Sequence, residues 1–484
     1  MHKIVFLLSY LLLAPHVFSA DTELNADVVQ RRQKMMESMG RRGMLILFSA
    51  DIVRYSGDVY YEFRQDSNLY YLTGLDQPNI TLVLMPQNES MREILFLPAR
   101  NFERELWTGD MLSPEEASAI SGIDTIWAAT EFDLFINSIL SGNPYRSTNP
   151  SEYEKFLVDL QGSIADIFLL LNTRPGLEKT RMKELKFSDH LRDQFSEIQI
   201  KDVSVILHQL RMIKSSYEIR QLTEAIDITT TALREAMKNI HPQIWEYEVE
   251  AIIEYVFKSN NPLDWAFPSI VASGPNATKL HYQKSLRQAG KDELMLMDVG
   301  AAVNYYTADI TRTVPVEGKF TPKQTTIYQL VLDAQKAAIE VVKPGASLRT
   351  INQASIKVLK DGLHRLGLIT NKDSDQYRAF FPHGTSHFLG LDVHDVSHGE
   401  RLKPNMILTI EPGIYVRKDS AERLVRHGAG KKDLEKVGPA IEKFMGIGVR
   451  IEDDVLVTDD SYKLLSDNAP RDIADIESIM MGSR

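Results

Sequence analysis

A chain of 484 residues is too long for one ordinary hydrophobic core, so it predicts two folded domains. Its 66 acidic residues outnumber its 55 lysines and arginines. The net charge of -11 argues against nucleic acid as a partner, because phosphate binding needs a basic face. The chain has no cysteine. Disulfides, thiolate zinc sites and a catalytic thiol are therefore excluded, and any metal must be held by His, Asp and Glu.

The first 20 residues match the pattern of a secretory signal peptide. Lys3 precedes an apolar run over residues 4–13, and small residues follow at Ser19 and Ala20. Cleavage is expected after one of these two small residues. The apolar run is shorter than the ~20 residues that span a bilayer, and no later segment is long enough. We therefore expect a protein without a membrane span that is exported, either to a bacterial periplasm or out of the cell.

Residues 21–205 alternate apolar strands with helical stretches, which is typical of an α/β domain. A charged amphipathic pattern predicts a helix over residues 26–43. Apolar runs predict strands over residues 44–48, 70–72, 80–85 and 93–97, and helices are expected over residues 114–121 and 152–160.

Residues 206–470 form a second predicted domain, and residues 471–484 are expected to be a C-terminal tail. Ser215 and Glu218 are the two ends of a capping box, in which each side chain bonds the backbone of the other residue. A long helix is therefore expected to begin there. Another helix is expected from Pro322 to the Pro344-Gly345 pair.

A pair of acids is the first chemical signal in the second domain. The apolar strand over residues 294–298 ends in Asp298, and a second strand-like stretch contains Asp309. Two antiparallel strands would bring these carboxylates together, and a buried charge needs a partner. Arg312 is a candidate partner. For this pair taken alone, an ion pair is favoured over a metal site.

Three more apolar segments each carry a histidine or an acid. Three of the twelve histidines lie close together in a loop that contains glycines: His383, His387 and His394. Imidazole is a common metal ligand and a proton carrier near neutral pH. Glu411 ends an apolar strand before a Pro-Gly turn. Strand alternation places Arg450 and Glu452 on one face.

Four such segments in one domain make a metal site the better hypothesis. Two Asp, two Glu and one His suit a pair of divalent ions. Mn²⁺ matches a carboxylate-rich set best, and Zn²⁺ and Co²⁺ are alternatives. Bridging carboxylates would hold both ions, and a shared water would lose a proton and attack a carbonyl.

The sequence around these residues resembles the pita-bread metallopeptidases, a superfamily that includes methionine aminopeptidase, aminopeptidase P and prolidase. The strings that carry the resemblance are His281-Tyr, Asp298-Val-Gly, Ala308-Asp-Ile-Thr-Arg-Thr313, His383-Gly-Thr-Ser-His387, Leu389-Gly-Leu-Asp-Val-His-Asp395, Thr409-Ile-Glu-Pro-Gly-Ile-Tyr415 and Val449-Arg-Ile-Glu-Asp-Asp454. They resemble the aminopeptidase P and prolidase branch most closely. Phe63-Arg-Gln-Asp-Ser-Asn68 and Tyr71-Leu-Thr-Gly74 resemble the accessory domain of that branch. The resemblance therefore covers nearly all of the chain after residue 20.

The resemblance implies a creatinase-like N-terminal α/β domain followed by a pita-bread catalytic domain. It implies five metal ligands: Asp298, Asp309, His387, Glu411 and Glu452. Glu411 would also take the proton of the attacking water. Catalytic or substrate-binding roles are implied for His281, His383, His394, Arg450 and Tyr415. Of these, the histidines would contact substrate and stabilise the tetrahedral intermediate.

Trp107 resembles a tryptophan that in aminopeptidases P reaches the active site of a neighbouring subunit. The resemblance therefore implies a homo-oligomer, either a dimer or a tetramer. The alternative for Trp107 is an ordinary buried or half-buried aromatic. His398 and His427 are predicted to be solvated loop residues.

The activity that the resemblance implies is that of an Xaa-Pro aminopeptidase, which removes the N-terminal residue of peptides with proline in second place. Prolidase, which cuts only Xaa-Pro dipeptides, is the main alternative. Residues 417–447 form an insert that is longer than expected for a compact aminopeptidase P and resembles the longer segment of prolidases. This insert would either shape the substrate entrance or be an exposed loop without a role. A metal-free creatinase-like hydrolase or peptide-binding module would have lost the ligands, all of which this chain retains. The long N-terminal domain disfavours a broad-specificity aminopeptidase.

Overall fold

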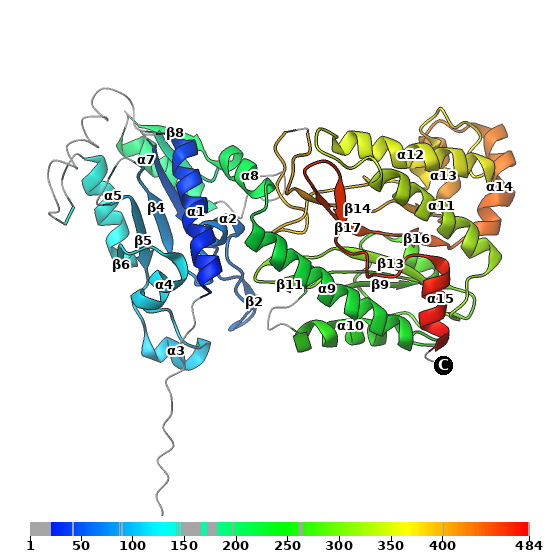
Figure 1. Cartoon of the computed structure of the whole chain (residues 1–484), viewed down its shortest axis with the longest axis horizontal. Coiled ribbons are helices and arrows are strands. Elements are labelled where there is room, and N and C mark those ends of the chain that lie inside the picture. The colour runs from blue at the N-terminus through cyan, green and yellow to red at the C-terminus, as the bar shows by residue number, and fades with distance from the viewer. Residues whose placement is uncertain are drawn as a thin grey trace, which may run out of the picture. The chain divides into compact units, whose positions relative to one another are not determined.

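The computed structural model describes residues 21–40, 43–86, 88, 91–141, 143, 145–146, 166–171, 182–195, 198–260, 265–399 and 401–482. The chain divides into two compact units, Met1–Ile206 (the first unit) and Leu207–Arg484 (the second unit). Both mix helices with strands, as expected (Figure 1). The predicted signal peptide and the predicted helix over residues 152–160 lie outside the described residues. Within the described ranges, no helix combines the length and the apolar character that a bilayer span requires.

A mixed six-stranded sheet forms the centre of the first unit, in the order β6-β5-β4-β1-β7-β8. Its strands are β1 (Gly43–Phe48), β4 (Thr81–Leu84), β5 (Glu93–Leu97), β6 (Ile126–Ala128), β7 (Asp166–Leu169) and β8 (Gln199–Asp202), and β2 (Arg54–Ser56) and β3 (Val59–Tyr60) form a separate hairpin. The helices are α1 (Thr22–Met39), α2 (Ser67–Thr73), α3 (Phe102–Thr108), α4 (Pro114–Ser121), a 3-10 turn (Ala129–Glu131), α5 (Phe132–Leu140) and α7 (Met182–Gln194). Helix α8 (Ser204–Met212) crosses the boundary between the units.

One face of this sheet packs against α5 and α7. Alternate strand residues such as Ile46, Val83 and Phe96 pack with Phe135 and Leu191 from the two helices. Burial of these side chains removes apolar surface from water, and this is the main favourable term in folding. The first unit therefore has a hydrophobic core of its own.

The predicted strand over residues 70–72 is wrong, because this run lies within helix α2. Asp66 caps the helix by accepting hydrogen bonds from the backbone N–H groups of Asn68 and Leu69, at 2.9 and 3.2 Å. Gly74 ends the helix in the left-handed conformation. A short aromatic run favours a strand by propensity, but caps at both ends decide the conformation here.

Among its described residues, the second unit contains four small antiparallel sheets. Their strands are β9 (Ile270–Ser273), β10 (Leu294–Val299) and β13 (Ile310–Pro315); β11 (Ala302–Val303) and β12 (Tyr306–Thr307); β14 (Ile407–Ile410), β17 (Asp453–Val457) and β18 (Tyr462–Leu464); and β15 (Gly413–Tyr415) and β16 (Gly448–Arg450). The helices are α9 (Ser216–Asn239), α10 (Glu246–Asn260), α11 (Pro322–Ile339), α12 (Leu348–Arg365), α13 (Ser420–Arg426), α14 (Lys431–Phe444) and α15 (Ile473–Gly482), with 3-10 turns at Gly274–Thr278 and Gln376–Ala379. Helix α9 begins with the predicted capping box of Ser215 and Glu218.

The connection between β10 and β13 depends on Gly300. A Cβ atom at this position would lie 1.8 Å from the carbonyl oxygen of Ala308, so no side chain fits. This close approach lets the chain turn directly after Asp298 and return through Asp309. The turn therefore helps to bring the two acids together.

The predicted C-terminal tail and the insert over residues 417–447 both contain helices. The predicted tail contains α15, whose Ile476 and Met480 are buried and which packs against α9 (Figure 1). The insert over residues 417–447 contains α13 and α14, and buries Leu424 and Phe444. A helical segment with a buried apolar face is part of the fold, so the alternative of an exposed loop is wrong, and a role at the substrate entrance stays a prediction.

Candidate metal centre and active site

Strands β10 and β13 bring three carboxylates together. Asp298 lies opposite Thr311 in the antiparallel register, and Asp309 precedes β13 directly. Glu452 reaches the same place because its backbone N–H donates to the carbonyl oxygen of Thr311, at 3.1 Å. The Thr311 hydroxyl also donates to Glu452 Oε2, at 2.7 Å. As a result, oxygens of Asp298, Asp309 and Glu452 lie within 4.8 Å of one another.

A second group of three ligands shares Glu452 with the first group. His387 Nε2 lies 3.9 Å from one oxygen of Glu411 and 3.9 Å from one oxygen of Glu452. The same nitrogen lies 3.4 Å from Asp309 Oδ2. The other ring nitrogen, Nδ1, lies 3.1 Å from the carbonyl oxygen of Phe388. Donation from Nδ1 leaves Nε2 free as an acceptor, which is the usual arrangement of a metal-binding histidine.

The electrostatics of this cluster favour bound cations. Burial, followed by the negative charges of Asp298 and Asp454, raises the pKa of Asp309 well above its usual range. Burial, followed by repulsion from Asp309 and Glu411, does the same for the pKa of Glu452. Burial also raises the pKa of Glu411 to about 7. Divalent ions would offset these costs by supplying positive charge among the carboxylates.

Buried polar atoms without a hydrogen-bond partner also favour bound cations at this site. Among the described residues these include Asp298 Oδ1, Asp454 Oδ1 and His387 Nε2. Such atoms are costly to bury unless an ion or water satisfies them. The five predicted ligands thus fit a pair of divalent ions, with Glu452 common to both groups.

A chain of hydrogen bonds leads from this cluster to His383. Arg450 Nη2 donates to Asp298 Oδ2, and Arg450 Nη1 donates to the Tyr415 hydroxyl at 3.0 Å. The Tyr415 hydroxyl lies 2.8 Å from His383 Nε2. Burial raises the pKa of Tyr415 to about 12. Burial, followed by the positive charge of Arg450, lowers the pKa of His383 to about 3, so this histidine is neutral.

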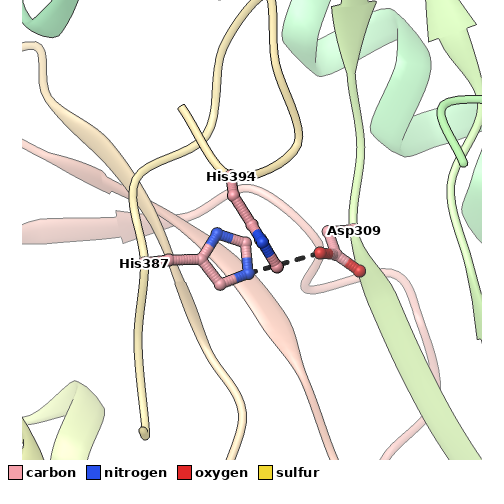
Figure 2. Close-up of side chains that lie close together, drawn as sticks. All are labelled: Asp309, His387 and His394. Atoms are coloured by element: carbon pink, nitrogen blue, oxygen red, sulfur yellow. Dashed lines mark ion pairs between the residues drawn. The ribbon is translucent and has the colours of Figure 1, made fainter. Parts of the chain in front are cut away.

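His394 and His281 lie beside the cluster. The ring of His394 is 4.3 Å from the ring of His387, and its ligand atom lies within 4.8 Å of those of Asp309 and His387 (Figure 2). His281 is exposed and contributes to lowering the pKa of His383, which indicates that the two are neighbours. Both histidines are therefore placed where substrate could reach them.

The predicted partner of the acid pair is wrong. Arg312 donates to Asp453 at 2.6 Å and to the carbonyl oxygens of Glu452 and Pro470, at 2.6 and 2.9 Å. It does not neutralise the cluster, because its guanidinium group is engaged behind it. Arg450, a residue 152 positions away in sequence, pairs with Asp298 instead.

Asp454 is a further acid at the centre, for which the sequence predicted no role. Its Oδ2 accepts a hydrogen bond from the backbone N–H of Asp309, at 3.2 Å. Burial raises the pKa of Asp454 well above its usual range. The signal was available, because strand alternation places Asp454 on the same face as Glu452.

Trp107 is not a buried aromatic. It lies on α3 and is 85% exposed, with Phe102 and Leu106 of the same helix also at least 80% exposed. His398 is exposed in a loop, as predicted. His427, predicted to be a solvated loop residue, is half-buried at the end of α13.

Comparisons with known proteins agree with this geometry. Residues 220–459 match the model of metallopeptidase family M24, and residues 28–147 match the model of the aminopeptidase P N-terminal domain. An Xaa-Pro aminopeptidase from Haemophilus influenzae is 34% identical over 461 residues, which cover 93% of this chain and 96% of that protein. The chain belongs to the aminopeptidase P family of M24 metallopeptidases.

Other members of the aminopeptidase P family share the fold over nearly the whole chain. Human Xaa-Pro aminopeptidase 3 is 31% identical, over 93% of this chain and 84% of that protein. The solved structure of zinc-substituted Escherichia coli aminopeptidase P in complex with product has a TM-score of 0.80 and 28% identity, covering 95% and 99% of the two chains. Aminopeptidase PepP from Pseudomonas aeruginosa has a TM-score of 0.80 and 30% identity, covering 95% and 98%. This member of the family is thus a metal-dependent aminopeptidase.

Proposed function

We propose that this enzyme removes the N-terminal residue from peptides whose second residue is proline. The observation that carries the proposal is the pairing of two ligand groups through Glu452, beside the chain from Asp298 through Arg450 and Tyr415 to His383. The names of the relatives from Haemophilus influenzae and human, both Xaa-Pro aminopeptidases, support this substrate class. Proline lacks an amide N–H and has a fixed φ, so its peptide bonds need a dedicated site.

Two divalent ions, most suitably Mn²⁺, complete the proposed centre. Asp298, Asp309 and Glu452 would hold one ion, and His387, Glu411 and Glu452 the other. When bound, the ions supply Lewis-acid polarisation of the scissile carbonyl and acidify an attacking water.

The side chains around the ions carry the proton and charge chemistry. Glu411 accepts the proton of the attacking water and lies 3.5 Å from His383 Nδ1. Neutral His383, with His281 and His394, stabilises the oxyanion and the leaving nitrogen. Arg450 orients Asp298 and the Tyr415 hydroxyl, which in turn holds the ring of His383.

Paired substrates test the substrate class. The metal-stripped enzyme is supplied with Mn²⁺ and offered an Xaa-Pro-Yaa tripeptide and the matching Xaa-Pro dipeptide. We expect release of the first residue from the tripeptide. Cleavage of the dipeptide alone would make the enzyme a prolidase and would give the helical insert over residues 417–447 a role in closing the site. Cleavage of neither substrate, with Mn²⁺, Zn²⁺ or Co²⁺, would overturn the proposal.

We further propose that the protein is exported and forms a homo-oligomer. The pattern of residues 1–20 supports export, and N-terminal sequencing of the mature protein should begin after Ser19 or Ala20. The exposed side chains of Phe102, Leu106 and Trp107 support self-association, because apolar groups gathered on one surface helix favour contact with another chain. Light scattering should show a dimer or tetramer, and Leu106→Glu should shift it toward the monomer.

A further inference from the structure

A second buried charge cluster lies directly behind the loop that carries His394. Its members are Arg211 at the end of α8, Lys214 in the following turn, and Asp395. Their side chains are 2%, 1% and 1% exposed. Lys214 Nζ donates to Asp395 Oδ2 at 2.9 Å, and Arg211 Nη2 donates to Asp395 Oδ1 at 2.6 Å.

Both cations of the cluster make further hydrogen bonds. Lys214 Nζ also donates to the backbone carbonyl oxygen of Arg211 at 2.8 Å, and Arg211 Nη2 also donates to Asp392 Oδ2 at 2.7 Å. Two buried cations thus meet one buried carboxylate, Asp395, and a second that is 43% exposed, Asp392. Burial of such a set costs several kcal/mol per ion before pairing, and apolar side chains of similar size are often as stable. Stability alone therefore does not explain why three charged side chains fill this space.

The cluster acts on a loop that has no regular secondary structure. Asp395 follows His394 directly, and its backbone N–H donates to the carbonyl oxygen of Phe388 at 2.9 Å. The same carbonyl oxygen lies 3.1 Å from His387 Nδ1. One oxygen atom thus ties the metal-ligand candidate to the residue after His394, and both imidazoles lie side by side (Figure 2).

Gly390 shows how closely the loop is fitted to the cluster. A Cβ atom there would lie 2.1 Å from Asp395 Oδ2 and 3.1 Å from Lys214 Nζ. The carbonyl oxygen of Gly390 accepts hydrogen bonds from the N–H and the hydroxyl of Thr307, both at 3.0 Å. Thr307 lies two residues before Asp309. The loop is therefore held on one side by the charge cluster and on the other by the strand that leads into the metal centre.

We propose that Lys214, Arg211 and Asp395 form a positioning network that fixes the imidazole of His394 over the metal centre. The inference rests on the proposed function, in which His394 stabilises charge in the transition state. Without such a network, the side chain of a residue on an irregular loop would have to be ordered each time the transition state forms, which costs conformational entropy. A displacement of about 1 Å can cost on the order of 10²-fold in rate.

A double-mutant cycle between Lys214 and His394 tests this positioning role. Lys214→Met keeps the volume and leaves Arg211 paired with Asp395. We expect kcat to fall about tenfold with KM and bound metal unchanged, because the loop is loosened but the ligands stay. In the His394→Ala background, the same substitution should change kcat by less than about twofold, because the group that it positions is absent.

The matched control is Arg32→Met in the first unit. Arg32 is also fully buried and pairs with Glu93 at 2.8 Å, so its loss should lower thermal stability without changing kcat. If Lys214→Met does not fold, Lys214→Gln takes its place. The Gln amide can still donate to Asp395, so the expected fall in kcat is smaller but must again vanish in the His394→Ala background.

Three outcomes overturn the inference. The first is an equal fall in kcat from the Lys214 variant in both backgrounds, which would mean that the network does not act through His394. The second is an equal fall for Arg32→Met, which would trace the loss to general destabilisation. The third is wild-type kcat in His394→Ala alone, which would first refute the proposed role of His394. The paired-substrate assay would still report separately on the activity itself.

Discussion

Asp453 and Asp454 are neighbours in the chain but lie in opposite electrostatic environments. Asp453 accepts hydrogen bonds from Arg312, Arg471 and Gln335, at 2.6, 3.0 and 2.9 Å. One oxygen of Asp454 accepts from the backbone of Asp309, and the other has no hydrogen-bond partner. A strand thus separates a carboxylate that protein cations satisfy from one that faces other carboxylates. The first supports the fold, and the second belongs to a centre in which the carboxylates outnumber the guanidinium group of Arg450.

The largest effect is expected in the carboxylate cluster of the metal centre, from the substitution Glu411→Gln. Turnover should fall by about 10³-fold or more, because the residue is both a proposed ligand and the proton acceptor. The metal-free protein should keep or gain stability, since the change removes charge from a crowded cluster. Steady-state kinetics, metal analysis and thermal unfolding of the metal-stripped protein measure this. Full activity with contaminating wild-type enzyme excluded would refute the assignment.

A loss of folding stability is expected instead from Asp453→Asn, because Asp453 is the carboxylate that is paired with cations of the protein. The variant should lose about 3–5 kcal/mol of unfolding free energy, because it leaves Arg312 buried without its carboxylate. Denaturant unfolding measures the loss. Asp454→Asn is the matched control, which should cost the metal-free protein little stability. Equal losses for the two variants would mean that the contrast between these neighbours is wrong.

A smaller effect is expected from His394→Ala, which removes no ligand of the proposed pair. We predict a fall in kcat of about 10²-fold with metal content unchanged. Steady-state kinetics and metal analysis of the same His394→Ala preparation measure both quantities. Loss of metal in step with activity would make His394 a ligand rather than a transition-state contact, and wild-type rates would make it a packing residue.

The smallest effect is expected from a change of pH on the melting temperature of the metal-free protein. A carboxyl group with a raised pKa in the folded state stabilises that state below the unfolded pKa, and the contribution is lost as pH rises through the folded pKa. The pKa of Glu411 is raised to about 7, and the pKa values of Asp309 and Glu452 are raised too. The metal-free protein should therefore melt on the order of 5 °C lower at pH 8 than at pH 5.

Saturating Mn²⁺ provides the control for this pH effect. The ions bind the deprotonated carboxylates, so their stabilising effect should grow as pH rises. Differential scanning calorimetry with and without Mn²⁺ gives both curves. A metal-free protein that is more stable at pH 8 would contradict the crowding of charge described above.

The sequence predicted the local part of the site well. Apolar strands that end in acids lead directly to Asp298 and Glu411, and the predicted approach of Asp298 and Asp309 is confirmed by the register of β10 and β13. These features depend on alternation and on a short turn, which a few neighbouring residues determine. The capping box at Ser215 was predictable for the same reason.

The partners of the buried charges were not predictable from local pattern. Arg312 was the nearest cation in sequence, yet Arg450 pairs with Asp298 across 152 positions. The network of Arg211, Lys214 and Asp395 was not predictable, because charged residues are usually on the surface. Which charges a fold buries together depends on long-range packing. The set of two Asp, two Glu and one His was suggested by their places in apolar strands and loops, and the family resemblance assigned their roles, which remain predictions.

The bonds of Arg312 to the carbonyl oxygens of Ala469 and Pro470 have a consequence for biosynthesis. The wall behind the metal centre is completed by residues 157 and 158 positions after Arg312, and α15, which follows them, packs against α9. The first unit ends at Ile206 and can fold while synthesis continues. The second unit can complete this wall only after Pro470 has been synthesised. A product truncated before Ala469 would lack two of the acceptors of Arg312, so the second unit should be less stable and more readily degraded.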